Sequence, residues 1–113
     1  MCALQGRAQK YNSNINEALL GINDPVQLVR QFESFGTKSP GSTEKFHTAK
    51  WIIDQYQQLG YDSIRIDSFL DAGTMVRNIV VTKTGLDSSY IVVCGHYDTR
   101  NGPGASDNGS GVA

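Results

Sequence analysis

The chain has 113 residues, a length that suits about one small domain. Hydrophobic residues make up 39% and charged residues 19%, and the formal net charge is -1 without a basic stripe, so the chain is expected to fold and to bind neither nucleic acid nor an anionic membrane. The longest apolar runs, such as Ile91–Cys94, are far shorter than the ~20 residues that cross a bilayer, so no membrane span is expected.

The N-terminal residues 1–23 are interpreted as a tail. The opening "MCALQGRAQ" has small residues at Gly6 and Ala8, a pattern that precedes a signal-peptidase cut, but it lacks the charged leader and the 7–15-residue apolar stretch that export requires. The tail is therefore either the remnant of a trimmed export signal or a disordered start. The first interpretation predicts a secreted or periplasmic protein.

A first helix is predicted in "NDPVQLVRQFESFG". Asp24 can cap the free amides, Pro25 suits the first turn, and Gly36 can end the helix after apolar residues at helical spacing. The turn-rich link "TKSPGS" follows.

A second helix is predicted in "STEKFHTAKWIIDQYQQLG", with Ser42 or Thr43 as its cap and Gly60 after its end. His47 lies within it without a ligand-like neighbour, which favours a structural or surface histidine. The predicted apolar face consists of Phe46, Ala49, Ile52, Ile53, Tyr56 and Leu59.

After Tyr61 the hydrophobic period changes to that of strands. "DSIRIDSF" alternates apolar and polar residues, while "MVRNIVVTK" and "YIVVCG" are rich in Val and Ile. We predict three strands in one sheet, near residues 62–69, 75–83 and 90–95, with His96 at the sheet edge. Cys94 is expected to be a buried apolar residue. Two helices followed by three strands indicate part of an α/β layered domain.

Polar chemistry begins where the last predicted strand ends, which is where α/β sheets commonly bind ligands. Gly95 allows a backbone turn, and His96 and Asp98 then become neighbours in "GHYDT". An imidazole binds zinc well when its other nitrogen donates to a carboxylate. The simpler alternative is a histidine–aspartate hydrogen bond without a metal.

The following "TRNGPGASDNGSG" supplies a second candidate ligand. Its glycines and proline shape an irregular loop that can hold Asp107 facing His96, and a carboxylate can bridge two metal ions roughly 3.5–4 Å apart. Three alternatives stay open for this stretch: a hairpin turn at Asn108-Gly109, the glycosylation triplet Asn108-Gly109-Ser110, or a plain glycine-rich loop.

The stretch "VVCGHYDTRNGPGASDNGSGVA" resembles the first metal-binding segment of the zinc-dependent exopeptidase family that includes bacterial di-zinc aminopeptidases, glutamate carboxypeptidases and glutaminyl cyclases. Upstream, "RQFESFGTKSPGSTEKFHTAKWIIDQYQQLGYDSIRID" and "VRNIVVTKTG" are similar to that family too. The resemblance covers residues 24–113. It implies the N-terminal portion of a three-layer αβα mixed-sheet domain.

The resemblance also implies roles for individual residues. It makes His96 a ligand of one zinc ion, Asp107 a ligand that bridges two, and Asp98 the catalytic residue that supports the histidine. The bond between Asp107 and Asn108 resembles the family's cis linkage. The family's later parts, a Glu-Glu pair with the general base, another acid and a distal histidine, do not occur in these 113 residues. The chain is therefore expected to be an N-terminal segment that is inactive by itself.

The implied activity is that of a di-zinc aminopeptidase, in which a metal-activated water hydrolyses a peptide or protein substrate at a free terminus. The alternatives are a glutaminyl-cyclase-like acyltransferase with one zinc ion and a non-catalytic scaffold of the same fold. "DNGSG" favours the peptidase over the cyclase, and the presence of His96 and Asp107 argues against the scaffold. An uncovered strand edge would make the isolated chain prone to self-association.

Overall fold

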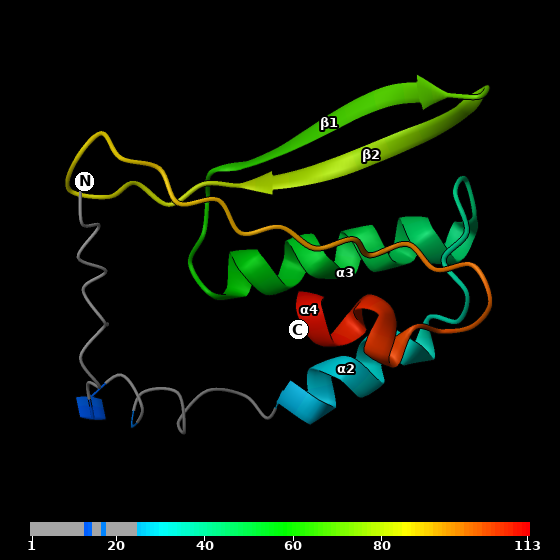
Figure 1. Cartoon of the computed structure of the whole chain (residues 1–113), viewed down its shortest axis with the longest axis horizontal. Helices are drawn as coiled ribbons and strands as arrows, with labels where there is room; N and C mark the ends of the chain where they lie inside the picture. The colour runs from blue at the N-terminus through cyan, green and yellow to red at the C-terminus, as the bar shows by residue number, and fades with distance from the viewer. Residues whose placement is uncertain (1–12, 15–16, 18–24) are drawn as a thin grey trace, which may run out of the picture.

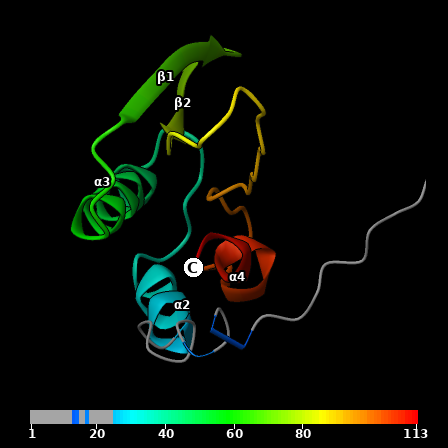
Figure 2. The same cartoon turned by 90° about the vertical axis from the view of Figure 1, so that its left-hand side faces the viewer.

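The structure is a computed structural model that describes residues 13–14, 17 and 25–113. The predicted Asp24 cap and most of the predicted tail lie outside the described residues. In chain order, the elements are α2 (Pro25–Ser34), α3 (Thr43–Gln58), β1 (Ile64–Asp71), β2 (Thr74–Val81), η1 (Ala105–Gly109) and α4 (Ser110–Val112). Figures 1 and 2 show the β1–β2 hairpin on one side of α3, with α2 and α4 beside one another on the other side. The arrangement is a small α/β fold.

Both predicted helices are confirmed, and local signals explain their ends. The Ser42 hydroxyl accepts a hydrogen bond from the Lys45 backbone amide at 3.1 Å, which identifies Ser42 as the cap of α3. Beyond the end of α3, Gly60 adopts a φ of +83° and its amide donates to the carbonyl of Gln57. Gly36 has the same left-handed conformation after α2 and turns the chain into the link toward α3.

The buried apolar residues come from both long helices. Phe32 of α2 is fully buried, and Ala49 and Ile52 of α3 are buried as their helical spacing predicts. Phe46 and Leu59, from the same predicted apolar face, are 53% and 65% exposed. Helical spacing predicts which face is apolar, but burial also needs a neighbouring element that covers that face.

The two strands form an antiparallel hairpin in which Ile64 pairs with Val81 and Asp71 with Thr74. Ala72 and Gly73 connect them, and both have positive φ values of 46° and 82°. Such a two-residue turn matches the right-handed twist of a hairpin. The first two predicted strands are therefore confirmed, with ends shifted by about two residues.

The third predicted strand is wrong for the structure as described, because residues 90–95 form no regular element and belong to no sheet. Ile91, Val92 and Val93 are 94%, 84% and 92% exposed, and Cys94 is exposed rather than buried. A run of Val and Ile predicts a strand only where neighbouring strands bind its backbone and cover its side chains. Within residues 25–113, β1 and β2 pair only with one another, so the sheet has two strands and His96 does not lie at its edge.

No helix in the described part of the chain combines the length and apolarity that a bilayer crossing requires.

Candidate metal centre

His96 and Asp107 face one another in the C-terminal part of the chain. The Nε2 atom of His96 lies 3.0 Å from Oδ1 of Asp107, although eleven residues separate them in sequence. The other ring nitrogen, Nδ1, lies 3.1 Å from the backbone oxygen of Asp98 and 3.5 Å from its Oδ1. The structure thus brings the three predicted site residues together around one imidazole ring.

The turn η1 places Asp107 opposite the histidine. Asp107 and Asn108 have non-helical backbone angles, and the peptide bond between them is cis, as the resemblance implies. Gly104 precedes the turn with a φ of +71°, and a Cβ there would meet the Thr99 side chain and lie 2.6 Å from the Asp107 backbone oxygen. Only glycine fits this close approach without displacing its neighbours.

A second glycine lets the end of this turn lie against the segment that carries His96. A Cβ on Gly95 would lie 3.0 Å from Nδ2 of Asn108 and 3.3 Å from the carbonyl oxygen of Gly111. The absence of a side chain at Gly95 therefore permits α4 to pack beside the residue that precedes His96.

The hydrogen bonds determine which atom of His96 can bind a cation. The Asp98 carbonyl can only accept, so Nδ1–H is the donor, and in the neutral imidazole the lone pair is then on Nε2, facing Asp107. This bond to Asp98 is the main cause that raises the pKa of His96 above 6.5, and the negative charges of Asp107 and Asp98 raise it further. The site therefore favours positive charge between the imidazole and the Asp107 carboxylate.

The chemistry of these donors fits zinc, which binds imidazole nitrogen and carboxylate oxygen. Residues 25–113 contain no group of three or more His, Cys, Asp or Glu side chains placed to hold one ion. His47 is exposed on α3, where its ring contacts Phe46. The described residues thus offer two ligands, whereas catalytic zinc sites use three protein ligands and a water.

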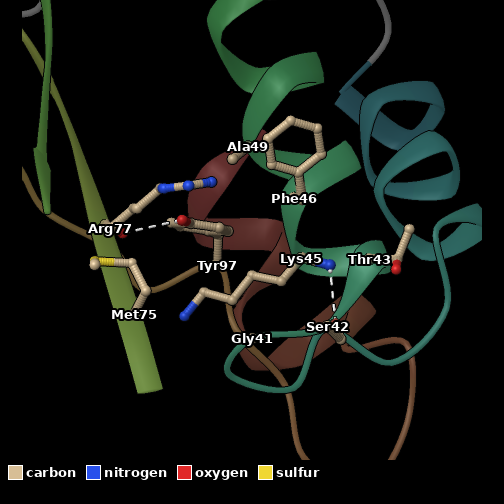
Figure 3. A pocket seen from close by; sticks show the side chains of 9 residues that line it. All are labelled: Gly41, Ser42, Thr43, Lys45, Phe46, Ala49, Met75, Arg77 and Tyr97. Carbon is tan, nitrogen blue, oxygen red and sulfur yellow. Dashed lines mark hydrogen bonds between the residues drawn. The ribbon is translucent and has the colours of Figure 1, made fainter. Parts of the chain in front are cut away.

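Tyr97 lies between His96 and Asp98 in sequence, but its side chain points away from the candidate metal centre. Its hydroxyl donates to the backbone oxygen of Arg77 at 3.0 Å, and its half-buried ring lines a hollow of about 290 Å³ between α3 and β2 (Figure 3). Lys45, Phe46 and Arg77 also line this hollow, and none of its lining residues is an acid or a histidine. The hollow is therefore distinct from the candidate metal centre, and its contacts anchor the segment that carries His96 and Asp98.

Residues 78–113 match the family model of Peptidase family M28. The matched range contains all three predicted site residues, and the match supports a metallopeptidase. Over 115 aligned residues, the chain is 28% identical to the uncharacterized protein YFR018C of Saccharomyces cerevisiae, an alignment that covers 93% of this chain and 31% of that protein. The chain thus spans about a third of the length of this relative. No solved structure matches this chain with significance.

Two buried residues that hold the segment between Asp98 and Asp107, one of them within it, were not predicted. Lys38 and Thr99 are both buried and hydrogen bond to one another through backbone and side chain. A lysine between turn residues is typical of a solvated loop, so the sequence carries no signal for its burial.

Proposed function

We propose that the 113-residue chain is a segment of a di-zinc metallo-exopeptidase of the aminopeptidase type. The complete protein would have a three-layer αβα domain. The observation that carries the proposal is the approach of His96 Nε2 to Asp107 Oδ1 at 3.0 Å, within the range that matches the peptidase family. The substrate would be a peptide or protein with a free terminus, and the complete protein would be secreted or periplasmic.

In this proposal His96 and Asp107 would hold the metal, and Asp107 would be the ligand common to both ions. Zinc, when bound, supplies a Lewis acid that makes water a nucleophile at neutral pH. The backbone oxygen of Asp98 accepts from Nδ1–H of His96 at 3.1 Å, with the Asp98 carboxylate at 3.5 Å, and this bond would leave Nε2 to bind the ion and fixes the orientation of the ring. The loop between Asp98 and Asp107 sets the distance between the two ligands.

The test is a set of variants of the full-length protein, assayed with aminoacyl chromogenic substrates in the presence of zinc. Asp98→Ala removes the carboxylate oxygen that lies 3.5 Å from Nδ1 of His96 but leaves the backbone oxygen that accepts at 3.1 Å, so it is expected to lower activity by no more than about tenfold. Asp107→Asn should lower activity further, because this carboxylate is proposed to bind both ions. His47→Ala is the matched control on the exposed face of α3 and should retain activity.

The competing functions predict different results in the same experiment. A cyclase would convert N-terminal glutamine and leave the aminoacyl substrates intact, and a scaffold would do neither. Comparable losses from Asp107→Asn and His47→Ala, in folded and zinc-loaded protein, would show that the site lies elsewhere.

The isolated 113-residue chain is expected to bind zinc weakly and to have no peptidase activity, since its described residues supply two ligands. Calorimetric titration with zinc, together with the same substrate assay, measures both properties. Metal-dependent turnover by the isolated chain would contradict the expectation of an incomplete site.

A further inference from the structure

Lys38, in the link between α2 and α3, has no solvent exposure. Lysines are almost never fully buried unless their ammonium group has partners. Here Nζ donates to the backbone oxygens of Gly36 and Pro103, both at 2.8 Å, and lies 3.9 Å from the centre of the Phe32 ring. Two hydrogen bonds and a cation–π contact therefore compensate for the loss of water around the charge.

The backbone of the same residue binds the same distant segment. The Lys38 amide donates to Oγ1 of Thr99 at 2.8 Å, and the Thr99 amide donates to the Lys38 carbonyl at 3.1 Å. With the bond to Pro103, three hydrogen bonds join one residue of the link to residues 99–103, more than sixty positions further along the chain.

These contacts are at the beginning of the loop that leads from Asp98 to Asp107. The far end of the loop is closed by its own hydrogen bond, from the Gly109 amide to the Gly104 carbonyl at 2.8 Å, and it lies against Phe32, since a Cβ on Gly109 would lie 2.8 Å from that ring. Phe32 and Lys38 thus form one buried support under both ends of the loop.

Burying the Lys38 ammonium costs free energy of hydration, which indicates that the group is needed to position the loop. Burial lowers the pKa of Lys38 below 10.5, although the negative charge of Glu33 raises it in part. An apolar side chain of similar length would fill the same space without losing the hydration of a charge. It could not, however, bind the Pro103 carbonyl and so determine where the loop begins its turn toward Asp107.

We propose that Lys38 is a positioning residue of the zinc site, which through Pro103 and Thr99 holds the loop that sets Asp107 opposite His96. This inference rests on the proposed zinc-binding function. Lys38 touches neither ligand, so its effect is on the geometry of the pair and therefore on the affinity of the site for zinc.

The decisive variant is Lys38→Met in the full-length protein, because methionine retains much of the apolar stem and removes the donors. We expect zinc affinity, measured by competition with a chelator, to fall by about 10–100-fold. Lys50→Met is the matched control: Lys50 pairs with Asp54 on an exposed face of α3, and its loss should leave affinity within about twofold.

A second measurement separates positioning from mere stabilisation. A purely structural lysine would lower the Tm of the zinc-free and zinc-loaded protein equally, whereas a positioning residue also reduces the rise in Tm that zinc causes. A folded Lys38→Met protein with wild-type zinc affinity and an unchanged zinc-induced rise would overturn the proposal.

Thr99→Val provides the test if Lys38→Met does not fold. Valine keeps the shape of threonine and removes only the hydroxyl that accepts from the Lys38 amide. Zinc affinity should fall by about two- to tenfold, the range expected for one hydrogen bond, and an unchanged affinity would overturn the proposal.

Asp107→Asn separates a failure of the proposed zinc site from a failure of the proposed role of Lys38. If it abolishes zinc binding while Lys38→Met and Thr99→Val have no effect, the metal site stands and the role of Lys38 is wrong. If Asp107→Asn leaves zinc binding intact, the proposed function fails, and the role of Lys38 in it fails as well.

Discussion

Two neighbouring stretches of the chain are held in opposite ways. Residues 99–109 are irregular, yet Thr99 is only 7% exposed, Gly109 is buried, and the loop between them is bonded to the link before α3. Residues 90–95 have a strong strand pattern, yet Val92 is 84% exposed. A strand-like sequence pattern thus does not tell which stretch is held in place. The irregular loop finds its hydrogen-bond and packing partners within the described residues, and the strand-like run does not.

The largest expected effect on stability comes from comparing a buried with an exposed apolar side chain in the 113-residue chain. Phe32→Ala should lower the free energy of unfolding by about 3–5 kcal/mol, because it opens a cavity under the loop. Val92→Ala should change it by less than about 0.5 kcal/mol, because the side chain is already in water. Urea denaturation followed by circular dichroism measures both values. Similar losses from the two variants would mean that residues 90–95 pack as tightly as the core.

The contrast also explains what the sequence could predict. Helices α2 and α3 and strands β1 and β2 depend on local signals such as the Ser42 cap and the hydrophobic period, and these were predicted, whereas the tight turn at Gly73 was not. The glycines and proline of the loop allowed Asp107 to face His96, and the family resemblance made this the expected arrangement, since a separation of eleven positions fixes no distance. The third strand depends on distant partners, and the burial of Lys38 depends in part on the carbonyl of Pro103, 65 positions along the chain, so neither is encoded in a local pattern.

A glycine pair gives the next largest effect. Gly104→Ala should destabilise the chain by about 1–3 kcal/mol from its left-handed backbone alone, and the contact with Thr99 adds to this. Gly85→Ala, in the stretch that leads to residues 90–95, meets nothing within 4 Å and should cost less than about 0.5 kcal/mol. The same denaturation experiment applies. An unchanged free energy of unfolding in Gly104→Ala would show that the loop before Asp107 does not need the left-handed backbone at this position.

The exposed run makes a prediction about association. The isolated chain should self-associate through residues 90–95, and Val92→Lys should weaken this by about tenfold, the equivalent of one valine no longer buried. Ser89→Lys introduces the same charge at an exposed residue just before that run and serves as the control. Analytical ultracentrifugation over a range of concentrations distinguishes them. Equal effects would indicate general charge repulsion rather than an apolar contact.

The smallest expected effect contrasts Tyr97, which precedes the held loop, with Tyr90 in the exposed run. Tyr97 is half-buried and donates to the Arg77 carbonyl, and burial raises its pKa above 10.0, an effect that the Arg77 charge reduces and the Asp98 charge reinforces. Because the folded state favours the neutral phenol, its contribution to stability is complete below pH 10.0 and is lost as pH rises through the higher folded pKa. Tyr97→Phe should therefore cost about 0.5–1.5 kcal/mol at neutral pH, the value of one hydrogen bond, and this difference should shrink at alkaline pH as the wild type weakens. Tyr90→Phe, at a residue that is 92% exposed, should leave both the neutral stability and its alkaline decline unchanged. Urea denaturation across this pH range tests the pair: a Tyr97→Phe deficit that stays constant or grows with pH would show that Tyr97 is not held in its neutral form beside the candidate metal centre.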